Sequence, residues 1–180
     1  MVTDLAEVRR LGEAKAAENL EFRRYLSAHH HYHIEPFQIL AEEIRRQIDC
    51  TGCANCCRSL AVTAGEADIE RIAGSLGMTP EAVAQQYTAP DPEAPAQRLL
   101  KSGKDGCIFL DGSLCTVYEA RPQTCREFPH LSPGTHSLGG RVSSICRRAA
   151  VCPIVYNTLE QYKHRVGYHS AGRLPSESVR

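Results

Sequence analysis

Four of the chain's nine cysteines fall within eight residues, in the run Cys50-Thr-Gly-Cys53-Ala-Asn-Cys56-Cys57. The other five are Cys107, Cys115, Cys125, Cys146 and Cys152. A Cys-x2-Cys-x2-Cys run lets three thiolates converge from one short loop, as in tetrahedral zinc sites and iron–sulfur clusters. The residues between these cysteines favour turns, whereas cysteines that only fill a core behave as small apolar side chains. The run therefore predicts a loop organised around a metal.

The cysteine count also argues against a disulfide framework. Nine is an odd number, so a closed set of disulfides would leave one thiol over. A disulfide between the adjacent Cys56 and Cys57 would be strained. The first ten residues contain acidic side chains and lack the apolar stretch of a secretory signal. We therefore expect a cytoplasmic protein whose thiols stay reduced and available to a metal.

Size and charge limit the expected partners. The 180 residues suffice for one ordinary domain, or for a small core with a helical appendage. The formal net charge is zero and Lys and Arg are dispersed, so no nucleic-acid partner is expected. No apolar run approaches the roughly 18 residues of a transmembrane helix, so no membrane partner is expected. With no Trp the core is modest, which favours stabilisation by a metal.

The first 48 residues predict a pair of helices. Residues 4–28 carry apolar side chains at helical spacing among strong helix formers, and residues 35–48 repeat the pattern. The segment His29-His30-His31-Tyr32-His33 separates the two. His29 and His33 would share a helix face, but such a patch is more often a solvated helix end than a metal site.

Helices and turns alternate after the cysteine run. The segment Thr63-Ala-Gly-Glu66 predicts a capping box, with its threonine as the N-cap of a helix that stops at Gly77. Thr79-Pro80 predicts a second helix start, with the helix running to about Tyr87. Residues 89–95 hold three prolines and predict a loop or linker.

Two short apolar pieces, residues 107–110 and 114–118, flank Asp111-Gly112 and predict a β-hairpin. A last helix is predicted from Pro153 to about residue 168, and we find no internal repeat in the sequence. The predicted fold is mainly α with a short β-hairpin, in a small irregular metal-stabilised domain with an N-terminal helical pair. The predicted domains are a helical extension at 1–48, a cysteine-cluster metal-binding domain at 49–169 and a flexible tail at 170–180.

The cysteines beyond the 50–57 run lie in recognisable segments. They are Cys107-Ile-Phe-Leu, Cys115-Thr-Val-Tyr-Glu-Ala-Arg-Pro, Cys125-Arg-Glu-Phe-Pro and Cys146. Over about residues 50–150 the chain resembles the bacterial YkgJ family of cysteine-cluster proteins, with its CxxCxxCC zinc- or iron-chelating domain. The resemblance implies metal binding and leaves any reaction open. The chain is similar to the larger flagellin lysine methylase family in the cysteine motif alone.

The resemblance implies eight ligand cysteines: Cys50, Cys53, Cys56, Cys57, Cys107, Cys115, Cys125 and Cys146. They could form two four-cysteine sites, either both zinc or one iron–sulfur cluster and one zinc. Cys152 is a ninth candidate, because Cys152-Pro153 is similar to the last Cys-Pro of ferredoxin runs, although helix initiation by the proline explains the pair equally well. The triple run favours an iron–sulfur cluster. Zinc is the alternative, because the other cysteines are spread singly and ligand softness does not separate the two metals.

Other side chains near the cysteines are weaker candidates. Three arginines could offset the negative charge of a thiolate-bound metal: Arg58, Arg121 and Arg126. For Arg58 an ordinary surface position is equally consistent with the sequence. Tyr118 and Phe128 are expected to pack rather than to carry electrons. His130 and His136 are candidate ligands that no pattern supports.

The expected function is metal binding. An iron–sulfur cluster with an electron-transfer or accessory role is the first hypothesis. The second is a zinc-binding structural or protein-interaction module, whose N-terminal helices contact an unknown protein partner. The sequence has no Gly-rich phosphate loop, Ser-His-Asp order or paired carboxylates, so it leaves open whether the protein is an enzyme.

Overall fold

The computed structural model describes residues 1–29, 34–131 and 138–169. The chain forms two compact units. The first, here the helical unit, joins Met1–Ile48 with Leu131–Arg180, and the second, here the cysteine unit, is Asp49–His130. These units group residues differently from the predicted domains, in which 49–169 belong together; those domain limits stay a prediction.

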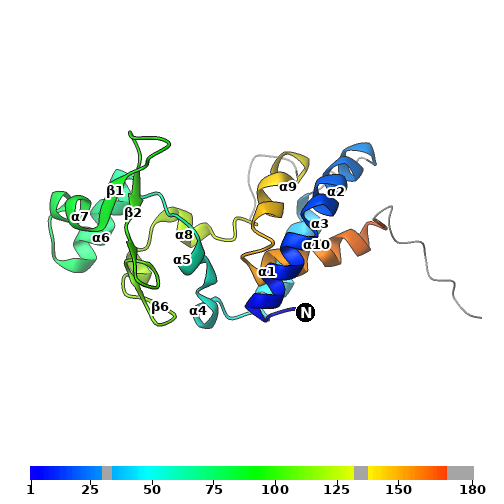
Figure 1. The fold of residues 1–180 in the computed structure, drawn as a ribbon, viewed down its shortest axis with the longest axis horizontal. Helices are drawn as coiled ribbons and strands as arrows, with labels where there is room; N and C mark the ends of the chain where they lie inside the picture. The colour runs from blue at the N-terminus through cyan, green and yellow to red at the C-terminus, as the bar shows by residue number, and fades with distance from the viewer. Residues whose placement is uncertain (30–33, 132–137, 170–180) are drawn as a thin grey trace, which may run out of the picture. The chain divides into compact units, whose positions relative to one another are not determined.

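The helical unit is built from both ends of the chain (Figure 1). Its helices are α1 Leu5–Ala14, α2 Ala16–Ala28, α3 Ile34–Arg45, α9 Leu138–Arg147 and α10 Pro153–Arg165. Asp4 caps α1, because its carboxylate accepts a hydrogen bond from the Glu7 N–H at 2.8 Å. The prediction of a single helix over 4–28 is wrong in one respect: the structure has two helices there, separated at Lys15, whose ψ is 8°.

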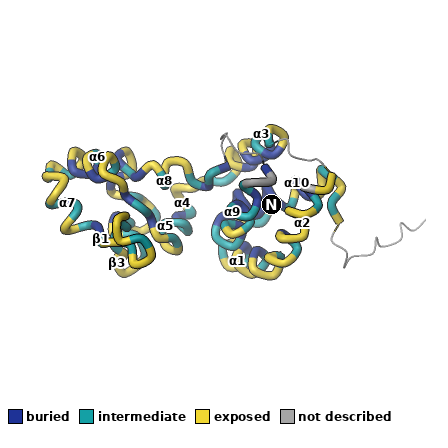
Figure 2. Tube along the Cα trace, turned by 90° about the horizontal axis from the view of Figure 1, so that it is seen from above, coloured by how far each residue is buried: buried dark blue, intermediate teal, exposed yellow. Residues whose placement is uncertain are grey.

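Packing in the helical unit joins the N-terminal helices to the C-terminal ones. Helix α2 packs on α9 and α3 packs on α10. The Phe37 and Tyr162 rings meet edge to face at 5.2 Å between centroids, and Phe22 is fully buried. Figure 2 shows the chain coloured by burial, with buried stretches in dark blue on the helices of this unit. Lys163 is only 4% exposed and donates to Glu18 and Glu160 at 2.7 Å each, so its buried charge is paired.

The cysteine unit contains short elements. Its helices are α4 Cys50–Cys53, α5 Asn55–Ser59, α6 Glu66–Leu76, α7 Pro80–Tyr87, the 3-10 helix η1 Tyr118–Ala120 and α8 Gln123–Glu127. Three antiparallel two-stranded sheets pair β1 Thr88–Pro90 with β2 Arg98–Leu100, β3 Ser102–Gly103 with β4 Gly106–Cys107, and β5 Leu110–Asp111 with β6 Leu114–Cys115. The described fold is thus mainly helical with short β-hairpins, as predicted.

The predicted ends of α6 and α7 are confirmed in three of four cases. Gly77 ends α6 with φ 65°, and Thr79 caps α7 by accepting from the Ala82 N–H at 3.2 Å. The predicted N-cap Thr63 is wrong. The helix starts two residues later behind Gly65, whose N–H donates to Asp68 Oδ2 at 3.1 Å. Thr63 pairs with Leu99 in an isolated β-bridge instead.

The loop predicted at 89–95 is wrong at its first two residues. Ala89 and Pro90 belong to β1 and pair with Leu99 and Arg98 of β2. Pro90 is tolerated because β1 is the edge of a two-stranded sheet, where its missing N–H breaks no inner ladder. The predicted hairpin at Asp111-Gly112 is confirmed, with Gly112 in the left-handed region at φ 59°.

The cysteine unit has its own apolar core. Buried side chains from α6, α7 and the hairpins form it, among them Ile72, Val83, Phe109 and Val117. Three cysteines pack against this core and are half-buried: Cys107, Cys115 and Cys125. Within the described residues, no helix combines the length and the apolar character that a membrane span requires.

Candidate metal centre

The cysteine run folds as two one-turn helices separated by a single reversed residue. Asp49 caps α4 by accepting from the Thr51 N–H at 2.9 Å. Ala54 then takes a left-handed conformation with φ 47°, which is uncommon for a residue with a Cβ, and α5 follows. The predicted turn between the cysteine pairs is therefore present. Cys50 is exposed, whereas Cys53, Cys56 and Cys57 are half-buried.

Arg58 fixes this run to the β5–β6 hairpin. Its guanidinium donates to the Cys53 carbonyl at 2.8 Å and to the Gly112 carbonyl at 2.7 Å. One side chain thus satisfies two backbone acceptors from segments more than fifty residues apart in sequence. The sequence left the role of Arg58 open, and the structure gives it a positioning role beside the cysteines.

Gly106 brings the β3–β4 hairpin against the same run. It has φ 128°, and a Cβ at this position would lie 2.5 Å from the Cys57 carbonyl oxygen and 2.6 Å from Arg58 Cα. Only glycine allows the two backbones to approach this closely. The next residue, Cys107, is thereby placed at α5. The sequence reasoning did not single out Gly106, although a glycine directly before a candidate ligand was a usable signal.

Four cysteines lie close enough for the charge on each thiolate to act on the others. Burial raises the pKa of Cys107, Cys115 and Cys125, the charge of Cys57 from α5 raises it further, and those three also interact among themselves. These four residues are called the interior cluster below. Asp68 helps to hold the fourth member, because its Oδ1 accepts from the Gln123 N–H at the start of α8 at 3.0 Å.

The interior cluster combines one cysteine that deprotonates easily with three cysteines that favour the protonated thiol. A hydrogen bond with Cys56, whose sulfur lies 4.0 Å away, lowers the pKa of Cys57 to about 6, and Arg58 and Arg121 add to this shift. Burial raises the pKa of Cys107 and Cys115, and raises the pKa of Cys125 to about 12. A bound cation would reverse the preference of these three cysteines for the thiol form, because it stabilises the thiolates and displaces their protons.

Arg121 provides positive charge at the interior cluster. Its charge helps to lower the pKa of Cys57 and opposes the burial that raises the pKa of Cys115 and Cys125, and its guanidinium carbon lies 3.6 Å from the centre of the Tyr118 ring. Its Nη1 atom is buried and finds no hydrogen-bond acceptor within the described parts of the chain. A buried N–H without an acceptor is costly, so this group fits a site that is completed by an anionic ligand sphere.

Arg126 supports the loop that carries Arg121. It donates from Nε to the Arg121 carbonyl and from Nη2 to the Glu119 carbonyl, each at 3.0 Å. Both arginines were predicted to lie beside the metal. In the structure they have different roles: Arg121 lies next to the sulfurs, whereas Arg126 holds the backbone of the loop that carries Arg121.

We expect Arg121→Met to weaken metal binding by about 10- to 100-fold, the range typical of groups that support metal ligands. Its loss raises the pKa values of three thiols, so protons compete better with the metal. Arg121→Lys is the matched control, because it keeps the charge but not the forked N–H groups. Affinity measured by competition with a chromophoric chelator checks this; equal affinity in wild type and Arg121→Met would contradict it.

The described side chains form no closed metal site as they stand. In residues 1–29, 34–131 and 138–169, no three His, Cys, Asp or Glu side chains are arranged to hold a metal ion. The chemistry of the interior cluster nevertheless fits zinc or iron, because its donors are all sulfur and Arg121 offers compensating charge. Binding would draw these thiols together, as expected where metal and folding are coupled.

The remaining predicted ligands lie in different surroundings. None of the nine cysteines, all of which lie in the described residues, forms a disulfide. Cys146 and Cys152 belong to the helical unit. The Cys146 sulfur lies 3.8 Å from the Asn19 carbonyl, and burial raises its pKa to about 11. Cys152 is buried as the N-cap of α10, directly before the proline at N1, which is the helix-initiating role that the sequence also allowed.

The histidines contribute no ligand set where they are described. His29 stacks on Tyr25 with 4.1 Å between ring centroids. His130 lies 3.8 Å from Glu127 Oε2. The other predicted candidates lie outside the described residues: His30, His31, His33 and His136.

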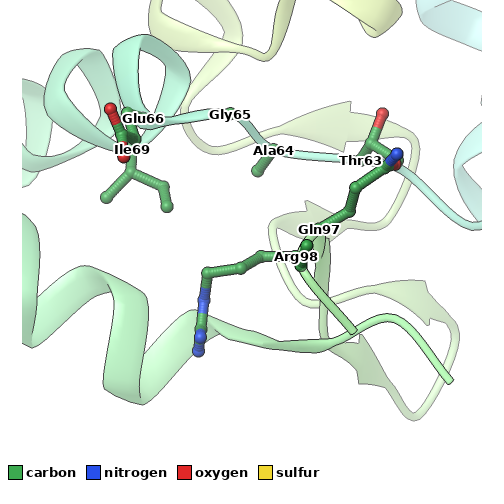
Figure 3. Close-up of a pocket in the computed structure, with 8 residues that line it drawn as sticks. Thr63, Ala64, Gly65, Glu66, Ile69, Gln97 and Arg98 are labelled. Carbon is green, nitrogen blue, oxygen red and sulfur yellow. The ribbon is translucent and has the colours of Figure 1, made fainter. Parts of the chain in front are cut away.

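A separate hollow of about 410 Å³ lies between the start of α6 and strand β2 (Figure 3). None of its eight lining residues is a cysteine. Arg98, which contributes to the lining, donates to Thr88 Oγ1 at 2.6 Å and to the Ala84 carbonyl at 3.0 Å. Its guanidinium is thus already engaged within the unit, and the hollow adds nothing to the cysteine chemistry.

Comparison with known protein families agrees with the chemistry of the cysteines. The family model described as CxxCxxCC, "Putative zinc- or iron-chelating domain", matches residues 49–153. This match covers more than half of the chain and includes all nine cysteines. No curated protein and no solved structure matches the chain.

Proposed function

The chain belongs to the CxxCxxCC family of zinc- or iron-chelating domains, and on this premise we propose that it holds an iron–sulfur cluster on the 50–57 run. Cys50, Cys53 and Cys56 would supply three corners of the cluster and a further cysteine the fourth. The observation that carries the proposal is the left-handed Ala54 between two one-turn helices. This reversal lets closely spaced cysteines turn toward a common centre.

The exposure of the run supports a role in electron transfer or as an accessory protein. Cys50 is exposed and its neighbours are half-buried, so a cluster held here would lie near the surface. A cluster near the surface can exchange electrons, or iron and sulfide, with another protein. The proposal places the protein in the cytoplasm, where the nine cysteine thiols stay reduced.

Metal analysis of protein purified without oxygen tests the proposal. We expect a brown protein with broad visible absorbance, iron and acid-labile sulfide in equal amounts, and an electron paramagnetic resonance signal after reduction. Triple substitution of Cys50, Cys53 and Cys56 by Ser should remove the iron and the sulfide. A colourless wild-type protein that contains only zinc would overturn the proposal.

A zinc-binding structural or protein-interaction module is the second candidate. Exposed apolar side chains on and beside the hairpins favour it: Ile108 at 38%, Leu114 at 60% and Tyr118 at 45% exposure. Such side chains suit contact with a partner protein. Under this alternative the protein contains zinc without sulfide, and Leu114→Ser weakens an interaction while leaving the metal content unchanged.

A further inference from the structure

A single carboxylate holds the starts of two helices in the cysteine unit. Asp68 lies in the first turn of α6, where its Oδ2 accepts from the Gly65 N–H at 3.1 Å. Its Oδ1 accepts from the Gln123 N–H, the first of α8, at 3.0 Å. The first N–H groups of a helix have no acceptor within the helix, so each bond satisfies a donor that would otherwise lack a partner. Asp68 thus ties α8 to α6, across 55 residues of sequence.

Helix α8 depends on this bond because it lacks a side-chain cap of its own. The helix has only five residues, Gln123–Glu127, and its N-cap Pro122 makes no side-chain hydrogen bond. So short a helix gains little from its internal hydrogen bonds, since the first turn fixes several residues for each bond formed. Contacts with other segments therefore decide where α8 lies, and with it Cys125, the third residue of the helix.

A second contact holds the next residue of α8. The Thr124 hydroxyl oxygen lies 3.4 Å from the hydroxyl oxygen of Thr63. Thr63 is itself fixed, because it pairs with Leu99 of β2 in the isolated β-bridge. The two residues directly before Cys125 are thus held by the segment 63–68, which contributes to the apolar core of the unit.

The carboxylate of Asp68 is itself held in one orientation. Only 13% of its side chain is exposed, and the Arg71 guanidinium forms an ion pair with its Oδ1. A largely buried carboxylate needs such a partner, and the two backbone donors direct its oxygens further. All three of these partners are nitrogen donors rather than sulfur, so Asp68 can act on Cys125 only through the backbone of α8.

We propose that Asp68 is a positioning residue for the metal centre, which sets the place of the Cys125 sulfur through α8. Cys125 is one of the cysteines within the family match, whereas Asp68 lies outside the cysteine motif. The inference rests on the proposed function, because it takes the cysteine unit to hold a metal. It requires that Cys125 is a ligand, but neither a particular metal nor a particular set of other ligands.

Residue-resolved alkylation of the full-length chain, kept in excess Zn²⁺, tests the inference. A thiolate bound to metal reacts slowly with iodoacetamide, so mass spectrometry reports which cysteines the metal holds. In Asp68→Ala we expect the alkylation rate of Cys125 to rise at least about tenfold over wild type, the scale typical of residues that orient metal ligands. The rates of Cys53 and Cys57 should change far less. Equal rises at all three cysteines, an unchanged rate at Cys125, or a wild-type Cys125 that zinc does not protect would each overturn the inference.

Two matched variants separate positioning from a general loss of stability. Thr79→Ala removes the side-chain cap of α7, a helix of the same unit that carries no cysteine. Arg71→Met removes the ion pair of Asp68 but leaves the acceptor for the Gln123 N–H in place. Neither variant should raise the alkylation rate of Cys125 selectively. A selective rise in Thr79→Ala as large as that in Asp68→Ala would show that any weakened helix start frees this cysteine, which contradicts the proposal.

Thr124→Val keeps the test decisive if Asp68→Ala does not fold. The valine has nearly the shape of threonine but removes the hydroxyl contact with Thr63. We expect a selective rise at Cys125 of roughly two- to tenfold, the factor that one neutral hydrogen bond contributes. Wild-type protection of Cys125 in this variant, beside an Asp68→Ala that does not fold, would leave α8 placed by other contacts and refute the proposal.

The metal content of the wild-type chain separates this inference from the proposed function. Zinc without iron or sulfide, together with a Cys125 whose protection depends on Asp68, would refute the iron–sulfur proposal alone. An iron–sulfur protein whose Cys125 is as well protected in Asp68→Ala as in wild type would refute the positioning role alone. A wild-type chain that takes up no metal would overturn both.

Discussion

Removing all metal should unfold the cysteine unit and leave the helical unit folded. The cysteine unit relies on strands of two or three residues, and an isolated hairpin of that size is marginal in water. Apparent binding free energies of structural zinc reach about 10–16 kcal/mol, which is comparable to the whole stability of a small domain. The helical unit instead has a continuous core between α2, α3, α9 and α10.

Residue-resolved nuclear magnetic resonance on chelator-treated protein measures this difference. Amide shifts from residues 49–130 should collapse to a narrow range, whereas those of α1, α2, α9 and α10 should stay dispersed and serve as the internal control. Restoring Zn²⁺ or rebuilding the cluster should recover the lost dispersion. Dispersed shifts for Phe109 and Val117 in verified metal-free protein would show that the unit folds without metal.

Gly106→Ala should lower the free energy of unfolding more than any other glycine-to-alanine substitution in the cysteine unit. The new Cβ would meet backbone atoms of Cys57 and Arg58 at 2.5 and 2.6 Å, and neither can move aside as a flexible side chain would. Strain at φ 128° costs about 1–3 kcal/mol and overpacking about as much again. We expect a loss of roughly 3–5 kcal/mol in the free energy of unfolding.

Gly103→Ala is the matched control, because it lies on the partner strand of the same hairpin. A Cβ there would have its closest contacts at 3.7 Å, an ordinary van der Waals distance. Its effect should stay below about 1 kcal/mol. Denaturant unfolding of the metal-loaded variants gives the comparison, together with their zinc content. If the two variants were equally stable, β4 would not be held against α5 as the structure has it.

The sequence was most informative where a local signal decides the structure. Thr79 caps the start of α7 with its side chain, Pro80 suits the first helical position through its ring, and Gly77 ends α6 by taking a left-handed conformation. These predicted helix ends are confirmed. Pro153 likewise begins α10. The general character of the site also followed from the sequence, since an all-cysteine donor set restricts the metals that can bind.

Predictions were wrong where contacts between distant segments decide the structure. A pair of glycines such as Gly139-Gly140 predicts a turn, yet both residues belong to α9. Helix propensity is a weak prior there, because Val142 and Ile145 are buried in the helical unit and favour the helix. Thr63 failed as an N-cap because it bonds across to β2. The interaction between Cys57 and Cys125 likewise joins segments far apart in the sequence, which no spacing rule encodes.

The helical unit combines an N-terminal and a C-terminal segment of the chain, so its folding during protein synthesis has to wait for the second segment. Helices α1 to α3 leave the ribosome first, but their partners α9 and α10 follow only after residues 49–130 have been made. At about 5–20 residues per second, this interval lasts on the order of 4–16 s. The apolar faces of the first helices stay uncovered during that time, which makes them targets for chaperones. The cysteine unit, by contrast, is complete as soon as His130 emerges, so it can acquire metal while the nascent chain is still growing.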